Sequence, residues 1–284
     1  MQQVTVRVPA STSNLGPGFD CLGVALRIYN HVTFSRGRKS RLPPIVTAAA
    51  RRFFNEIGRD AFTFSVSCST GVPAARGLGA SATIRLGVLH GLNELSGRPL
   101  DQLSIFRLSG ELEGHPDNVA PACFGGFTIV RDMTVQRFPV SARLCFVLLV
   151  PELEIKTTAA RQILPRCIRR VDAVENCGNA CAIAAAFASR RYEDLRGAFT
   201  DHLHQPFRKK LIPFLPRVIA AAEKAGALGA FLSGSGSAIC AVTLGDRHEV
   251  ADAMLRASKC AGHVIITTAD NRGVQISNPH AALD

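Results

Sequence analysis

The glycine-rich stretch from Gly71 to Thr83 constrains this chain most, because it joins a strand pattern to a helix pattern. Before it, residues 62–67 alternate apolar and polar side chains, which predicts a strand. After it, apolar residues recur at helical spacing from Ile84 until Gly97 ends the pattern. The glycines therefore precede a helix N-terminus, where unpaired N–H groups and the helix dipole favour an anion.

Two known phosphate-binding patterns can be tested against this stretch. The Walker pattern requires a lysine after its second glycine, and no lysine follows Gly77. The dinucleotide pattern GxGxxG/A is met by Gly77, Gly79 and Ala82, but eight residues, 69–76, separate the strand from Gly77. A Rossmann fold makes that turn at once. The stretch by itself therefore leaves two interpretations open, a phosphate-binding loop and a tight strand-to-helix connection.

The composition predicts a globular protein with one large or two modest domains. Of 284 residues, 47% are hydrophobic and 19% are charged. No apolar run approaches the roughly 20 residues of a transmembrane helix, and the N-terminus lacks the apolar block of a signal peptide. We therefore expect a cytoplasmic protein without a membrane partner. The net charge of +11 comes from scattered basic pairs with little aromatic interleaving, which favours small anionic ligands over nucleic acid.

Nine cysteines show no metal-ligand spacing. Cys177 and Cys181 are four residues apart, but no second Cys/His pair lies at a suitable distance. An odd number of cysteines in a chain expected in the cytoplasm favours reduced, mostly buried thiols.

Two further stretches concentrate polar side chains on irregular backbone. Residues 9–20 follow a strand pattern and hold Asn14 and Asp20 between prolines and glycines, either as a plain surface loop or as substrate contacts. The second stretch follows a helix pattern over residues 101–113 that Gly114 ends. It carries Glu111, Glu113, His115, Asp117 and Asn118. This density indicates a functional site, and the alternative is an N-cap for a following helix.

The pattern restarts around residues 136–142, so we predict domains of residues 1–138 and 139–284. In the second domain, residues 144–150 form a near-continuous apolar run, typical of a strand buried on both faces. A strand–helix–strand–strand–helix–strand order, with extra helices inserted, then predicts a ferredoxin-like arrangement.

Residues 9–20, 73–83 and 232–238 together resemble the three motifs of the GHMP small-molecule kinases. The sequences at 113–121, 157–165 and 204–208 are similar to the branch of that family that acts on L-homoserine. The motifs occur in the family's order, so the resemblance covers most of the chain.

The resemblance implies transfer of the ATP γ-phosphoryl group to the side-chain hydroxyl of L-homoserine, giving O-phospho-L-homoserine for threonine synthesis. It implies an α+β fold of two domains. The N-terminal, ATP-binding domain would be like the second domain of ribosomal protein S5, and the C-terminal domain would be ferredoxin-like, with the active site between them. Many members are homodimers, so we expect a homodimer here too.

The resemblance also assigns roles on the nucleotide side. ATP would be bound by the whole loop, namely Pro73, Ala74, Ala75, Arg76, Gly77, Leu78, Gly79, Ala80, Ser81, Ala82 and Thr83. Ser81 and Glu113 would ligate Mg²⁺, an ion that takes oxygen ligands, with Glu111 as the alternative carboxylate. Asn118 stands where many GHMP kinases carry a catalytic aspartate, which implies orientation of the hydroxyl and not strong base catalysis.

On the substrate side, Arg161 and Arg208 suit bidentate capture of an α-carboxylate. Asp20 would pair with the ammonium or the hydroxyl group. The pocket would be completed by Asn14, His115, Asp117 and Thr157, and Asn30 is a candidate for the adenine pocket.

Two motif positions depart from the family pattern, since Ala80 replaces a serine and Ser237 replaces a proline. Neither change removes a charge. Three alternatives stay open: a GHMP kinase for another substrate such as mevalonate, a non-catalytic sensor with the same fold, and a Rossmann oxidoreductase. Paired arginines with Asp20 favour an amino-acid substrate, and the intact Ser81 and Asn118 favour catalysis.

Overall fold

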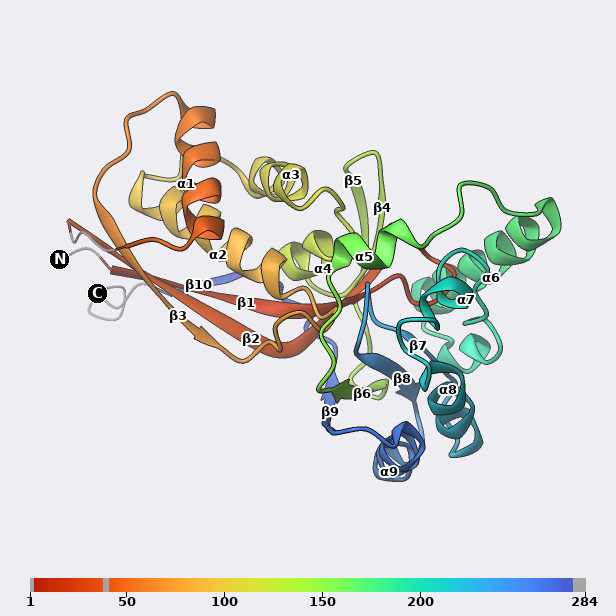
Figure 1. Ribbon diagram of the computed structural model, residues 1–284. Helices are drawn as coiled ribbons and strands as arrows, with labels where there is room; N and C mark the ends of the chain where they lie inside the picture. Colours follow the sequence, from red (N-terminus) through yellow and green to blue (C-terminus); the bar gives the residue numbers. More distant parts are fainter. Residues whose placement is uncertain (1–2, 38–40, 278–284) are drawn as a thin grey trace.

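Two antiparallel β-sheets form the framework of this α+β protein, in a computed structural model that describes residues 3–37 and 41–277 (Figure 1). The first sheet has the order β10-β1-β2-β4-β5, and β3 pairs with the second half of β2. Its strands are β1 (Gln3–Ser13), β2 (Leu22–Arg36), β3 (Phe64–Thr70), β4 (Phe127–Arg131), β5 (Thr134–Phe138) and β10 (Gln275–Ser277).

Four helices cover one face of the first sheet (Figure 1), namely α1 (Pro44–Ile57), α2 (Ala80–Leu95), α3 (Gln102–Glu113) and α4 (Val119–Phe124). The central helix α2 contacts both β1 and β2. It approaches them closely because Gly91 has no side chain, and a Cβ there would come within 2.3 Å of the Phe34 ring. The predicted helices after the glycine-rich stretch and over residues 101–113 are therefore confirmed.

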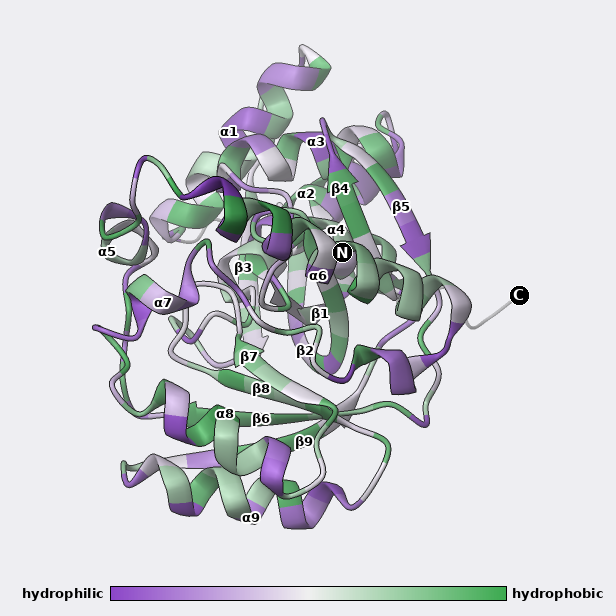
Figure 2. Ribbon diagram, turned by 90° about the vertical axis from the view of Figure 1, so that its right-hand side faces the viewer, coloured by the Kyte–Doolittle hydropathy of each residue, from purple (hydrophilic) through white to green (hydrophobic). Residues whose placement is uncertain are grey.

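The second sheet has the order β7-β8-β6-β9. Its strands are β6 (Cys145–Pro151), β7 (Gly229–Leu232), β8 (Ile239–Thr243) and β9 (Gly262–Thr268). Figure 2 shows α8 (Leu215–Lys224) and α9 (Arg247–Ser258) across one face of this sheet. This order and connectivity confirm the ferredoxin-like prediction. β6 is buried along its whole length, because Phe146 and Leu148 join one apolar cluster and Val147 and Leu149 another.

Between β6 and α8 the chain forms α5 (Thr157–Gln162), α6 (Arg170–Ser189), a 3₁₀ turn (Tyr192–Leu195) and the short α7 (Gln205–Arg208). Phe187 on α6 stacks on Phe127 of the first sheet with 4.3 Å between ring centroids. The same apolar cluster includes Phe146 and Phe231 of the second sheet. The two halves therefore share a core that fixes their relative positions.

The last strand of the chain returns to the first sheet, where β10 pairs with β1 through Thr5, Val6 and Arg7. The strands otherwise change sheets between Phe138 and Cys145. The domain boundary between residues 138 and 139 stays a prediction, and the return of β10 was not foreseen.

Every one of the nine cysteines is a free thiol, as predicted. Four are exposed, however, so the expectation that they are mostly buried is wrong. Two of these, Cys177 and Cys181, lie on the outer side of α6. Within residues 3–37 and 41–277, no helix has the length and apolarity needed to cross a bilayer.

Candidate active site

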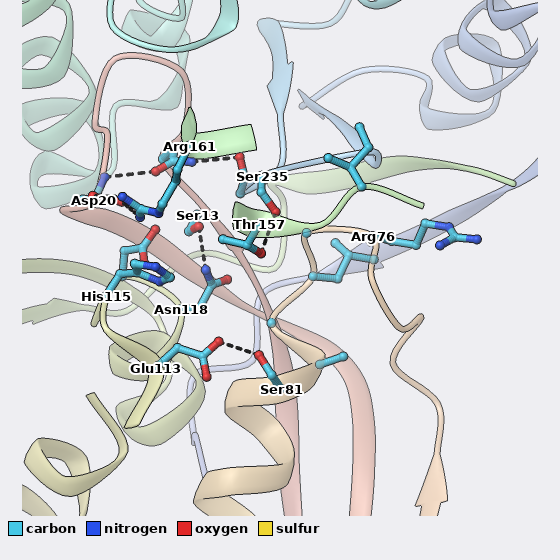
Figure 3. Close-up of a pocket in the computed structure, with 18 of the residues that line it drawn as sticks. Ser13, Asp20, Arg76, Ser81, Glu113, His115, Asn118, Thr157, Arg161 and Ser235 are labelled. Carbon is cyan, nitrogen blue, oxygen red and sulfur yellow. Dashed lines mark hydrogen bonds and ion pairs between the residues drawn. The ribbon is translucent and has the colours of Figure 1, made fainter. Parts of the chain in front are cut away.

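A cavity of about 280 Å³ lies where the two halves meet, and it brings together residues from six separate stretches of the chain. Figure 3 shows their polar side chains around a common space. The lining residues are Ser13, Asn14, Phe19, Asp20, Ala75, Arg76, Gly77, Leu78, Gly79, Ala80, Ser81, Glu113, His115, Asp117, Asn118, Ile155, Thr157, Arg161, Arg208, Gly234 and Ser235.

The glycine-rich loop forms one wall of this cavity and ends at the N-terminus of α2. In the part of the chain that the structure describes, the N–H groups of residues 75–79 donate no hydrogen bond to the protein. Gly79 is the N-cap of α2 and has φ +71°. Residues 75–79 and the first two residues of α2 line the cavity. Unpaired N–H groups at a helix N-terminus favour negative charge, so this wall suits an anion.

Gly77 lets the loop contact the second domain backbone to backbone. Its φ is +72°, and a Cβ would lie 2.1 Å from the carbonyl oxygen of Ser233. The Ser233 hydroxyl donates to the Gly77 carbonyl at 2.7 Å, and the Ala238 N–H donates to the Arg76 carbonyl at 3.0 Å. The glycine turn at residues 233–237 therefore supports the loop directly.

Asn30 anchors the start of the loop from within the first sheet. Its Oδ1 accepts from the N–H groups of Gly71 and Val72, each at 3.0 Å, and its Nδ2 donates to Thr83 Oγ1 at 2.7 Å. The side chain is buried and does not line the cavity. Its geometry is that of a loop anchor, and its assignment to an adenine pocket stays a prediction.

Glu113 connects the end of α3 to the start of α2. The Ser81 hydroxyl donates to Glu113 Oε1, and the Arg85 guanidinium contacts the other carboxylate oxygen. Glu111 instead points outward, where it is 57% exposed and pairs with Arg52 at 2.9 Å. Of the two carboxylates, Glu113 is the one that lines the cavity.

A hydroxyl beside a carboxylate fits Mg²⁺, which is held by one or two protein oxygens together with substrate phosphates. Within the described ranges, no group of three or more His, Cys, Asp or Glu side chains is placed to hold a metal ion.

Asn118 is held at the centre of the cavity by two serines of β1. Its Nδ2 donates to Ser13 Oγ at 2.9 Å, and its Oδ1 accepts from Ser11 Oγ at 3.0 Å. Asn118 also occupies the N-cap position of α4, but its side chain makes no capping hydrogen bond there. The side chain of Asn118 thus bonds to the serines that line β1 and does not cap the helix.

Asp117 and His115 lie beside Asn118 on the same irregular turn. Asp117 is only 3% exposed, and Oδ1 has no hydrogen-bond partner among the described residues. Burial, and then the charge of Asp20, raise the pKa of Asp117 to about 6. Burial, and then the nearby Arg161, lower the pKa of His115. A cation bound beside this turn would be attracted to the carboxylates of Asp117 and Asp20.

Asp20 and Arg161 pair across the cavity from the loop (Figure 3). Two hydrogen bonds, at 2.6 and 2.9 Å, join the Arg161 guanidinium to the Asp20 carboxylate. The Arg161 guanidinium also lies 5.3 Å from the centre of the Phe19 ring, and Thr157 Oγ1 lies 3.3 Å from Ser235 Oγ nearby. About a third of each charged side chain is exposed, so both are accessible to a ligand.

Arg208 of α7 is the second arginine of the cavity, and it is almost fully buried. Nε donates to the Ala160 carbonyl at 3.1 Å and Nη1 donates to the Gly234 carbonyl at 2.9 Å. Asn14 Nδ2 donates to the same Gly234 carbonyl at 2.9 Å. Burial, and then the positive charge of Arg161, lower the pKa of Arg208 to about 10.

Most of the predicted site residues therefore line one cavity. The exceptions are at the two ends of the loop, where Pro73, Ala74, Ala82 and Thr83 do not line it. Ala82 and Thr83 are buried instead, and the Thr83 hydroxyl donates to the Ala80 carbonyl. Arg76 lines the edge of the cavity, but its guanidinium points away toward the Pro151 carbonyl (Figure 3).

Sequence reasoning missed the residues that position others. These are Ser11 and Ser13 beside Asn118, Arg85 beside Glu113, and Phe19 with His204 beside Arg208. The only available signal was position, since the serines lie in the first motif and Arg85 lies one helical turn after Ser81.

Comparisons with known proteins show the family to which the chain belongs. Residues 44–126 match the family model for the GHMP kinases N terminal domain, and residues 183–260 match that for the GHMP kinases C terminal domain. The solved mevalonate kinase of Methanococcus jannaschii, 14% identical over 93% of this chain and 97% of that one, shares the fold with a TM-score of 0.70. The fold and the site therefore define a GHMP kinase, an ATP-dependent small-molecule kinase.

Relatives with higher sequence identity indicate the branch of the GHMP kinase family. Homoserine kinase of Caldicellulosiruptor bescii is 36% identical over 96% of both chains, and that of a Synechococcus strain is 37% identical over 92% of both. The crystal structure of homoserine kinase from Cytophaga hutchinsonii superposes with a TM-score of 0.88 at 28% identity, covering 98% of each chain. The chain belongs to the homoserine kinases within the GHMP family, which confirms the predicted family and two-domain fold.

Proposed function

We propose that this protein transfers the γ-phosphoryl group of ATP to the side-chain hydroxyl of L-homoserine and so forms O-phospho-L-homoserine. One observation carries the proposal. A single cavity holds free backbone N–H groups on one wall and a carboxylate with two guanidinium groups on the other. The first wall suits a triphosphate and the second suits a small zwitterion. The similarity to homoserine kinases selects the amino acid.

ATP would lie with its triphosphate against the backbone of residues 75–82 and the N-terminus of α2. Ser81 and Glu113 would hold the Mg²⁺ ion, which neutralises part of the phosphate charge when it is bound. Arg85 already neutralises Glu113. The carboxylate is thus paired before any ion arrives.

L-Homoserine would bind with its α-carboxylate toward Arg161 and Arg208 and its ammonium toward Asp20 and Asp117. Such binding requires Arg161 to exchange part of its contact with Asp20 for the substrate carboxylate. His115, Thr157 and Asn14 would form the remaining walls. Charge-assisted, bidentate contacts of this kind fix both the position and the orientation of a small molecule.

In the transfer step, the homoserine hydroxyl oxygen forms a bond to Pγ while the bond from Pγ to the β–γ bridging oxygen breaks, and ADP leaves. Asn118 cannot accept the hydroxyl proton, because an amide side chain is not a base at neutral pH. Held by Ser11 and Ser13, it would orient the hydroxyl. The hydroxyl proton is transferred to an oxygen of the phosphoryl group or is released to solvent. Rate enhancement would then come from positioning and charge neutralisation, as phosphoryl transfer requires.

The two departures from the motif pattern fit this proposal. Ala80 lines the cavity without a hydroxyl, which makes Ser81 the hydroxyl available to an ion at the start of α2. Ser237 donates a hydrogen bond to the Leu153 carbonyl. That contact ties the glycine turn to the loop after β6.

The product would enter threonine synthesis, and we place the enzyme in the cytoplasm. Nine free thiols, four of them exposed, are compatible with the reducing conditions there. A homodimer stays a prediction from the family resemblance.

The test is ADP release measured with L-homoserine, mevalonate and shikimate side by side. The proposal expects turnover with homoserine to exceed that with either other alcohol by about 100-fold or more. Equal or faster turnover of mevalonate would assign the chain to another GHMP specificity. Nucleotide binding without turnover of any alcohol would instead support a non-catalytic sensor.

A further inference from the structure

His204 lies fully buried where the second domain meets the loop of residues 14–20, and it has no part in the binding or transfer steps described above. Its ring stacks on Phe19 with 5.2 Å between centroids. Nε2 lies 2.9 Å from the carbonyl oxygen of Gly16, and Nδ1 lies 3.2 Å from Arg208 Nη1. One imidazole therefore touches both the loop that carries Asp20 and the buried arginine.

These two partners allow a single tautomer of His204. A carbonyl oxygen can only accept a hydrogen bond, so Nε2 must carry the proton that points at Gly16. A guanidinium can only donate, so Nδ1 must present its lone pair to Arg208. The carboxylate of Asp201 lies 3.4 Å from Nε2 and is a second acceptor on the same side. The neutral ring with the proton on Nε2 satisfies every contact.

The surroundings keep the ring neutral. Burial is the largest influence and, with the adjacent Arg208, it lowers the pKa of His204 to about 4, although the carboxylates of Asp201 and Asp20 act in the opposite direction. A proton on Nδ1 would also face a donor of Arg208. The ring thus stays an acceptor for Arg208 throughout the physiological pH range.

We propose that His204, as this tautomer, is a positioning residue that holds Arg208 in place against the loop of residues 14–20. It thereby sets the separation between the arginine meant for the substrate carboxylate and the loop that carries the carboxylate of Asp20. This inference rests on the proposed function. The Gly234 carbonyl accepts hydrogen bonds from both Arg208 and Asn14. Arg208 is therefore held from two sides, by His204 and by Gly234.

Three substitutions separate the two contacts. His204→Asn keeps an oxygen near the position of Nδ1 for Arg208 but cannot reach Gly16. His204→Gln keeps a donor near the position of Nε2 for Gly16 but leaves Arg208 without this acceptor. His204→Phe keeps the stacking on Phe19 and loses both contacts. His202→Asn is the matched control, because His202 is partly exposed and pairs with Glu175 instead.

The expected signature is a split between the two substrates. His204→Phe raises the KM for homoserine by about 30-fold, because two buried hydrogen bonds are lost and one involves a charged group. His204→Asn and His204→Gln raise it by smaller factors of about three to tenfold, each retaining one contact. The KM for ATP stays within about twofold in all variants, and the control matches wild type.

Three results would overturn the inference: an unchanged homoserine KM in every variant, parallel rises in both KM values, or conservative variants as impaired as His204→Phe. Thermal unfolding is measured on each variant. If His204→Phe does not fold, the Asn and Gln variants decide by the same split.

The tautomer is tested without any turnover by ¹⁵N NMR of the imidazole nitrogens. Between about pH 5 and pH 8 the inference expects a protonated Nε2 and an unprotonated Nδ1, and the reverse assignment would overturn it. Wild-type protein that shows this tautomer but does not phosphorylate homoserine would refute the proposed function and the substrate half of the inference, while leaving His204 as the link between Gly16 and Arg208.

Discussion

The two walls of the cavity are built in different ways. The nucleotide wall consists of backbone from one continuous stretch, and its shape depends on positive φ angles at Gly77 and Gly79. The substrate wall consists of charged side chains from residues as far apart as Asp20, Arg161 and Arg208. Asp20 and Arg161 pair with each other, and Arg208 shares the Gly234 carbonyl with Asn14. The nucleotide wall is thus formed by neighbouring residues of the sequence and mainly by their backbone. The substrate wall is formed by charged side chains that only the fold brings together.

This difference predicts how each wall responds to change. A backbone wall tolerates side-chain substitution but not the loss of a glycine conformation. A wall of paired charges tolerates backbone variation but responds strongly when one partner of a buried contact is removed. Substitutions in the nucleotide wall should therefore change the kinetic constants for ATP. Substitutions in the substrate wall should change those for homoserine.

The largest effect is expected for Gly77→Ala. The new methyl group would lie 2.1 Å from the Ser233 carbonyl oxygen, so the loop must move away from the second domain. We expect kcat/KM for ATP to fall by more than about 100-fold, since misplacing phosphate-binding groups by an ångström is costly. Gly97→Ala is the control, because Gly97 also has a positive φ of +83° but has no atom within 4 Å of a new Cβ. Equal losses in both variants would show that backbone strain, and not the contact, is responsible.

The next effect is expected for Arg208→Ala. Removing a buried guanidinium with three hydrogen-bond partners should raise the KM for homoserine by about 100-fold and leave the KM for ATP within about threefold. Steady-state kinetics with each substrate varied in turn measures this. Arg52→Ala removes two surface ion pairs, with Glu56 and Glu111, and should change neither constant. A parallel rise in both constants for Arg208→Ala would contradict the carboxylate assignment.

A smaller effect is expected for Glu113→Gln, measured as the Mg²⁺ concentration at half-maximal rate. Losing one carboxylate ligand should raise that concentration by about tenfold, and isothermal titration of ATP with and without Mg²⁺ should show a weaker metal dependence of nucleotide binding. Glu111→Gln should behave as wild type, because that side chain is exposed and paired with Arg52. The opposite outcome would assign the metal to Glu111.

The smallest effect concerns stability and Asp117. Its native pKa of about 6 lies above the ordinary value of 3.8, so the native state holds a proton that the unfolded state has released. Stability therefore falls as pH rises from about 4 to 6, and the penalty persists at neutral pH. Asp117→Asn should raise the free energy of unfolding at pH 7 by about 1–3 kcal/mol and have no such effect below pH 4. A destabilised variant at pH 7 would mean that the carboxylate is not strained in the free enzyme.

The local wall could be predicted from the sequence, because a strand pattern, glycines and a helix pattern follow one another within the stretch. The distant partners could not. Ser11 and Ser13 acquire their role only when β1 meets Asn118, more than 100 residues later. Likewise, nothing near His204 indicates that its ring will reach Gly16, 188 residues away. The return of β10 to β1 has the same cause, since strand pairing depends on tertiary contacts and not on local propensity.

The family motifs supplied what local patterns could not. They selected Arg161, Arg208 and Asp20 as partners for one ligand, and the structure brings these three to one cavity. They did not distinguish Glu113 from Glu111, because both lie at the end of one helix and only burial separates them.

One wall of the cavity would bind a small zwitterion through both of its charges. This binding mode is tested by comparing kcat/KM for L-homoserine with kcat/KM for two truncated alcohols. These are 3-amino-1-propanol, which lacks the α-carboxylate, and γ-hydroxybutyrate, which lacks the ammonium group. We expect each truncated alcohol to lose about 100-fold or more, because each lacks one of the two charged groups that the substrate wall would contact. A loss of less than about threefold for either one would contradict it.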